Sequence, residues 1–204
     1  MQLKELRLKG MWPLEEIGFE HDVLLQRIEC LVIEGCKKLR NLGPSSISFG
    51  YLRYLEVVDC RMRSLMTPST AKTLVQLKTM KVSYCPRIVD IVAENVEKEV
   101  EVIEFNQLKS LELVSLQNLT SFSNGEKCEL KFPLLEELVV SECPKLKKLF
   151  GVRSAPNLEK VHVVAGEKDK WYWEGDLNST LKKHFTDQVC IIIFSFNFIQ
   201  MVRN

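Results

Sequence analysis

The stretch that decides the fold reads Ile28-x-x-Leu31-x-Ile33-x-x-Cys36-x-x-Leu39-x-x-Leu42. Copies of this phrase start at residues 3, 28, 52, 77, 108, 135 and 158. The copies from 77 and 135 keep the spacing residue for residue, and those from 3 and 108 carry Met11 and Leu116 in the cysteine position. The copy from 52 loses one residue, and the last copy stops early. One structural unit is therefore repeated along the chain.

The steps between these starts run from 23 residues (135 to 158) to 31 residues (77 to 108). Most fall within the interval of about 20–29 residues that leucine-rich repeats use. Leu-x-Leu alternation is the period of a strand with one buried face, and parallel strands need a crossover. We predict an α/β leucine-rich-repeat solenoid with about seven short parallel strands on a concave face. Its convex side should be irregular or short-helical, with one helix over residues 68–74 capped by Ser69.

The residues that flank the second and third apolar positions of each phrase should point away from the core. Any one of these side chains is adequately explained as solvated surface. As a set they predict a partner surface, because leucine-rich repeats use their concave face for binding. The candidate contacts are Arg7, Tyr54, Glu56, Lys81, Glu112, Glu137, Lys160 and His162.

Composition narrows the choice of partners. A net charge of +1 with 27% charged and 46% hydrophobic residues is typical of a globular domain. It gives no electrostatic reason to expect nucleic acid or a membrane as partner. Charged residues from Lys4 to Lys9 interrupt the first apolar residues, so we expect no signal peptide and a cytoplasmic location.

Four of the seven cysteines share one position of the repeat: Cys36, Cys60, Cys85 and Cys143. We interpret them as small buried apolar residues. Stacked repeats would bring Cys36 and Cys60 about 4.8 Å apart, which allows a disulfide geometrically, but the cytosol disfavours one. The sequence contains no Cys-x-x-Cys pair, so it does not predict a zinc site.

We divide the chain into a solenoid over residues 1–165, a cap with a short helix over 166–187, and a hydrophobic tail over 188–204. The first phrase has no polar cap before it, so we expect an N-terminally truncated fragment. Leu177, Leu181 and Phe185 predict the cap helix. The acidic run Glu94–Glu104 is expected to be a solvated loop. The tail is too short for a membrane helix, and its composition is compatible with a non-native origin.

Catalytic motifs are missing. The sequence has no phosphate-binding loop, no Gly-x-Gly-x-x-Gly and no Gly-x-Ser-x-Gly, and its three histidines are far apart in the chain. We therefore expect neither an enzyme nor a cofactor or metal site.

Several motifs resemble the C-terminal repeats of plant coiled-coil NB-ARC leucine-rich-repeat (NLR) disease-resistance proteins. They are residues 67–77, 116–122, 132–138, 143–147 and 171–178, and the resemblance covers about residues 1–189. It implies a protein-protein recognition module of an intracellular immune receptor. Such a module senses pathogen effectors or modified host proteins and restrains the receptor's nucleotide switch. The implied partners are an effector, a guarded host protein or the receptor's own nucleotide-binding domain.

The chain departs from this family by lacking the coiled coil and the nucleotide-binding domain with its phosphate loop. An alternative is the substrate-binding repeat array of an F-box ubiquitin-ligase adaptor, which also uses phrases such as Cys143-Pro144-Lys145-Leu146. Both functions rest on protein-protein contact, so the fold alone does not separate them.

Overall fold

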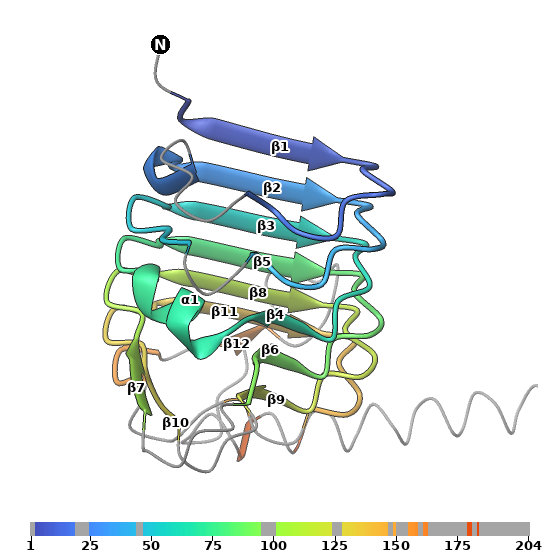
Figure 1. The fold of residues 1–204 in the computed structure, drawn as a ribbon. Coiled ribbons are helices and arrows are strands. Elements are labelled where there is room, and N and C mark those ends of the chain that lie inside the picture. The colour runs from blue at the N-terminus through green and yellow to red at the C-terminus, as the bar shows by residue number, and fades with distance from the viewer. Residues whose placement is uncertain are drawn as a thin grey trace, which may run out of the picture.

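Each copy of the phrase builds one strand of a single parallel sheet in the computed structural model (Figure 1). The structure describes residues 3–18, 25–43, 47–94, 101–123, 128–146, 149, 155–158, 161–162, 179–180 and 183. The seven strands follow one another in chain order and lie side by side. They are β1 Glu5–Lys9, β2 Cys30–Glu34, β3 Tyr54–Val58, β5 Thr79–Ser83, β8 Ser110–Val114, β11 Glu137–Ser141 and β12 Val161–His162. This confirms the predicted leucine-rich-repeat solenoid.

Register is kept from the first strand to the last. Leu6 pairs with Leu31, Leu31 with Leu55, and the same column continues to Val161 in β12. Alternate residues of the central strands are fully buried, and the residues between them are partly exposed. The two-residue period of the phrase therefore separates a core face from an outer face, as expected.

A column of left-handed residues ends each of the first six strands. Gly10, Gly35, Asp59, Tyr84, Ser115 and Glu142 all have φ between 53° and 67°. The first five donate their N–H to the carbonyl of the last strand residue in the next repeat, at 2.8–3.0 Å. The left-handed turn thus adds one more backbone hydrogen bond to each pair of strands. It directs the chain toward the side of the solenoid opposite the seven-stranded sheet, which we call the far side. Four of the six residues are not glycine, and they adopt a conformation that costs L-residues about 1 kcal/mol or more.

The cysteine position follows this turn and is buried, as predicted. Each of the four thiols donates to the carbonyl oxygen two residues before it, at 3.3–3.7 Å. Burial raises the pKa of the Cys143 thiol to about 12. A hydrogen bond with the Cys85 thiol, together with burial, raises the pKa of Cys60. All four are free thiols, and they act as small apolar residues with a weak donor.

The far side of the solenoid carries the predicted helix and more strands than expected. Helix α1 spans Pro68–Thr73, but its N-cap is Thr67, whose hydroxyl accepts from the Thr70 N–H at 3.2 Å. The prediction of Ser69 as cap was wrong, because Pro68 takes the first helical position, where its missing N–H costs nothing. Three short parallel strands, β4 Ser64–Met66, β6 Asp90–Val92 and β9 Ser121–Ser123, form a second sheet.

Part of the acidic run is a strand rather than a solvated loop. Strand β7, Glu101–Glu104, pairs in parallel with β10, Cys128–Lys131. Ile103 is buried, while Glu104 remains at the surface and pairs with Lys131 at 2.9 Å. Burial of the apolar residues that alternate with the glutamates therefore stabilises a strand here in spite of the negative charge. Residues 95–100 of this run lie outside the described part of the chain.

Three phenylalanines fill the core on the side of these small sheets. The rings of Phe105 and Phe132 stack with centroids 5.1 Å apart, and the ring of Phe122 meets both edge-on at 5.8 and 5.3 Å. All three are fully buried. Phe105 and Phe132 each lie three residues before the first leucine of a phrase and accept its N–H through their carbonyls. Phe49 and Leu74 do the same in earlier repeats, so the repeating unit includes an apolar position that precedes the phrase.

Leu25, in the short 3-10 helix η1 (Leu25–Arg27), holds the same position in the repeat from Ile28. Its carbonyl accepts the Ile28 N–H. Of the predicted cap helix the structure describes only Ser179, Thr180 and Lys183, which are helical. The aromatic run 171–173, the tail 188–204 and the rest of the proposed cap lie outside the described residues. The domain boundaries therefore stay a proposal.

Candidate partner-binding face of the sheet

The outward residues of the seven strands form three straight columns, which we call the sheet face. The middle column joins Arg7, Val32, Glu56, Lys81, Glu112, Val139 and His162. The column before it joins Glu5, Cys30, Tyr54, Thr79, Ser110 and Glu137. The column after it joins Lys9, Glu34, Val58, Ser83, Val114 and Ser141. Seven of the eight predicted contact residues thus lie in these columns.

The centre of the sheet face is a polar cluster over β3, β5 and β8. The Tyr54 hydroxyl donates to Glu56 Oε2 at 2.9 Å, and Lys81 Nζ pairs with Glu112 Oε2 at 2.8 Å. The hydrogen bond with Glu112 raises the pKa of Lys81, which stays protonated. Burial and the bond to Glu56 raise the pKa of Tyr54. Each contact fixes a long side chain in one geometry while leaving it partly exposed.

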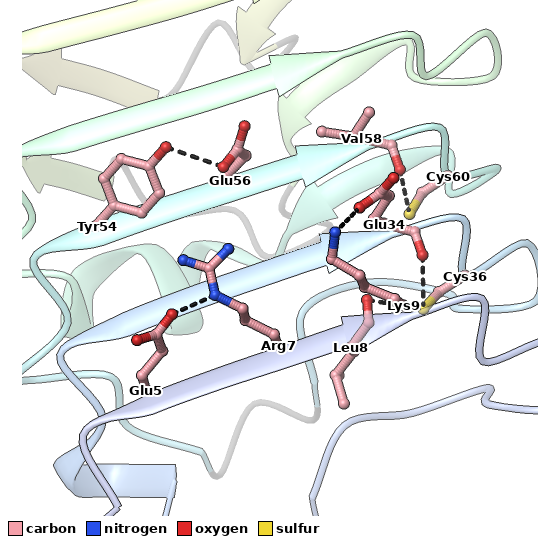
Figure 2. Close-up of polar contacts among 10 residues, drawn as sticks. All are labelled: Glu5, Arg7, Leu8, Lys9, Glu34, Cys36, Tyr54, Glu56, Val58 and Cys60. Carbon is pink, nitrogen blue, oxygen red and sulfur yellow. Dashed lines mark hydrogen bonds and ion pairs between the residues drawn. The ribbon is translucent and has the colours of Figure 1, made fainter.

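Side-chain contacts also occur toward each end of the sheet face. Figure 2 shows Arg7 against Glu5 within β1, and Lys9 of β1 reaching Glu34 of β2 at 2.6 Å. Farther along the sheet, the Ser110 hydroxyl donates to Glu137 Oε2 at 2.9 Å. Lys9, Glu34 and Ser110 were not among the predicted contacts. The sequence feature that could have identified them is a pair of complementary polar side chains at equivalent positions of adjacent repeats. Such pairs can be recognised only once the register of the strands is known.

Two predicted contacts stand apart from the other six. His162, in the last strand, is only 7% exposed, and its role as a contact stays a prediction. The strand period gives its direction, but exposure at the end of a sheet also depends on what packs beyond the last strand. Lys160 lies outside the described residues. Val32 also points outward yet is 4% exposed, so the middle column includes a covered apolar position next to Arg7.

The sheet face carries an excess of negative charge. Its described columns hold five carboxylates and three cationic groups, leaving His162 aside. Glu56 and Glu137 accept hydrogen bonds from hydroxyl groups and, within the described structure, form no ion pair. Two carboxylates therefore remain available to a cationic group from outside.

Other chemistry has little support in the part of the chain that the structure describes. No three His, Cys, Asp or Glu side chains are grouped there so that they could hold a metal ion. Asp90, the one strongly buried carboxylate among the described residues, lies on the far side and accepts a hydrogen bond from Ser121 at 3.0 Å. Burial raises its pKa. No helix among the described residues is long and apolar enough to cross a bilayer.

Comparison with protein families agrees with this architecture. The family described as "Plant disease resistance protein RPS2-like, leucine-rich repeats" matches residues 47–165, more than half of the 204-residue chain. No curated protein and no solved structure matches the chain significantly. The matched residues run from β3 to β12 and so include most of the sheet face. The solenoid, the regular outer face of its sheet and the family match together place this chain in the RPS2-like leucine-rich-repeat family of plant disease-resistance proteins, as a protein-interaction module.

Proposed function

We propose that the sheet face is the recognition surface of an intracellular plant immune receptor. Its partner would be a pathogen effector, a modified host protein or the receptor's own nucleotide-binding domain, which the repeats would restrain. The observation that carries this proposal is the unbroken register of β1 to β12, which displays three columns of varied side chains on one rigid surface. A surface of this kind recognises a partner by shape and charge rather than by chemistry on a substrate.

Preorganisation supports a binding role for the polar cluster. Ordering a long side chain on association costs about 0.5–1.5 kcal/mol. Tyr54, Lys81 and Glu112 already hold one geometry through their contacts with neighbouring side chains. Less side-chain entropy is therefore lost when a partner covers them.

Charge indicates which partner surface would fit. Glu56 and Glu137 accept only hydroxyl hydrogen bonds, and the sheet face as a whole has more carboxylates than cations. A partner that places Lys or Arg groups over β3 and β11 would form ion pairs with both carboxylates. Complementarity of this kind contributes to specificity and to the association rate.

Tyr54 and Tyr51 make a matched pair of variants. Tyr54 lies on the sheet face, whereas Tyr51 precedes β3, is outside the three columns and is 57% exposed. In a chimaeric receptor carrying residues 1–189 as its terminal repeats, we expect Tyr54→Ala to weaken ligand-triggered signalling or to release restraint. The expected loss of partner affinity is about tenfold or more, as for an aromatic interface anchor. Tyr51→Ala should leave both signals at wild-type level.

Equal thermal melting of the two variants would exclude a folding defect as the cause. If Tyr51→Ala disturbs signalling and Tyr54→Ala does not, the recognition surface lies on another side of the solenoid.

A further inference from the structure

The loops that follow β2, β3 and β5 carry a concentration of unpaired positive charge, and we call them the basic rim. Its exposed cations without an ion pair in the described structure are Lys38, Arg61, Arg63 and Arg87. Of these, Arg63 already faces a carboxylate, because burial raises the pKa of Asp90 and the charge of Arg63 opposes that rise. Two other cations of these loops are paired, Lys37 with Asp59 and Arg40 with Glu15. Lys38, Arg61 and Arg87, one in each of three successive loops, are therefore open to an external anion.

These loops are stacked at the spacing of the strands. The Gly35 and Asp59 N–H groups donate to the carbonyls of Val58 and Ser83 in the next repeat, each at 3.0 Å. The Cys60 N–H reaches the sulfur of Cys85 at 3.4 Å. Lys38 and Arg87 lie two residues after the cysteine of their repeats and Arg61 lies one residue after it, and all three directly precede a buried apolar residue, Leu39, Ile88 and Met62. The three cations therefore lie in corresponding parts of successive loops. Like charges in neighbouring loops repel one another unless a counter-charge lies across them.

The opposite rim of the same sheet is built differently. There Lys4 pairs with Glu29 at 2.8 Å, Arg53 with the same Glu29 at 3.4 Å, and Lys109 with Glu136 at 2.7 Å. Five of the six described residues in this column thus form ion pairs with equivalent positions of adjacent repeats, and Lys78 is the exception. After the strands the balance differs, because Lys38, Arg61 and Arg87 form no ion pair within the described structure.

Tyr84 stands on the basic rim in a strained conformation. Its φ is 55° and its side chain is 58% exposed. Glycine occupies the equivalent positions 10 and 35, where it adopts this turn without strain. A bulky residue in the left-handed region is uncommon, and strained residues of this kind concentrate at functional sites. Tyr and Arg are also the residues that most often anchor protein interfaces.

We infer that the basic rim is a second interaction surface, separate from the sheet face, and that it binds an acidic protein segment. Carboxylates of that segment would lie across Lys38, Arg61 and Arg87, and an apolar side chain would pack on Tyr84. A guanidinium group binds a carboxylate through two parallel hydrogen bonds, which suits Arg61 and Arg87. A protein segment fits better than nucleic acid, because the net charge of the whole chain is only +1.

The probe is a fluorescein-labelled peptide of about twelve residues in which glutamate alternates with serine around one central leucine. Its affinity for the 204-residue chain is measured by fluorescence anisotropy at near-physiological salt. We expect Arg61→Glu with Arg87→Glu to raise the Kd about tenfold or more. The matched control, Arg53→Glu with Lys78→Glu, reverses two cations on the opposite rim and should change the Kd less than about twofold.

Two further measurements keep the proposal falsifiable. Tyr84→Gly removes the aromatic ring and relieves the turn, so it should weaken peptide binding while melting at or above the wild-type temperature. A single-stranded DNA oligonucleotide of equal charge should bind more weakly than the peptide. Equal loss of binding in both double variants, no peptide binding by the wild type, unchanged binding by Tyr84→Gly, or tighter binding of the oligonucleotide would each overturn the proposal. None of these outcomes depends on the sheet face.

Discussion

Leu111→Asp is expected to unfold the repeat domain at room temperature. Leu111 is fully buried in β8, an interior strand of the seven-stranded sheet, where it pairs with Met80 on one side and Leu138 on the other. A carboxylate there would have only apolar neighbours. Burying an unpaired charge costs several kcal/mol, which is comparable to the roughly 5–15 kcal/mol that stabilise a whole domain. Circular dichroism during thermal and urea denaturation should show the loss.

The adjacent Glu112 provides the control for this substitution. It points to the opposite side of the same strand and pairs with Lys81 at a partly exposed position. Glu112→Ala should cost no more than about 1 kcal/mol, as is usual for an exposed ion pair. Similar destabilisation by the two variants would mean that the assignment of core and outer faces is wrong.

Phe122→Ala should be the most damaging truncation on the far side of the core. The ring contacts both Phe105 and Phe132 edge-on, and it has no exposed surface. Removing a buried phenylalanine side chain costs about 3–5 kcal/mol, because the surrounding rings cannot fully close the cavity. The free energy of unfolding from urea titration measures this loss.

Phe122→Leu preserves most of the volume and should cost less than about 1.5 kcal/mol. If both variants lose the same amount, the edge-on ring contacts rather than the cavity dominate. If Phe122→Ala loses less than about 1 kcal/mol, the three rings are not the core of the far side.

The phrase from Ile28 to Leu42 is sufficient to predict the main sheet. Its Leu-x-Leu spacing assigns each buried strand residue, and repetition assigns its neighbours, because identical positions of successive repeats pair with one another. The same reasoning placed Tyr54, Glu56, Lys81 and Glu112 on the outer face. Their partners could not be predicted with equal certainty, because side-chain contacts depend on length and rotamer as well as on register.

Three features needed the structure. The upstream apolar position of Phe49, Phe105 and Phe132 lies in crossovers of unequal length, so its repetition is less regular than that of the leucines. The left-handed column is recognisable in sequence only at Gly10 and Gly35, because the other four residues carry side chains. The pairing of β7 with β10 joins segments outside the phrase, where no periodic signal aligns them.

Exchange of the charges between Lys81 and Glu112 tests the central claim most directly, since the claim is that the sheet face recognises a partner. Lys81→Glu with Glu112→Lys keeps an ion pair between β5 and β8 but places a carboxylate opposite Glu56, so the free energy of unfolding should fall by no more than about 1 kcal/mol. It reverses the charge pattern that a partner meets. In the chimaeric receptor we predict that ligand-triggered signalling, or restraint without ligand, changes in this exchanged variant although its folding does not. Wild-type signalling and restraint in a normally folded exchanged variant would contradict the claim.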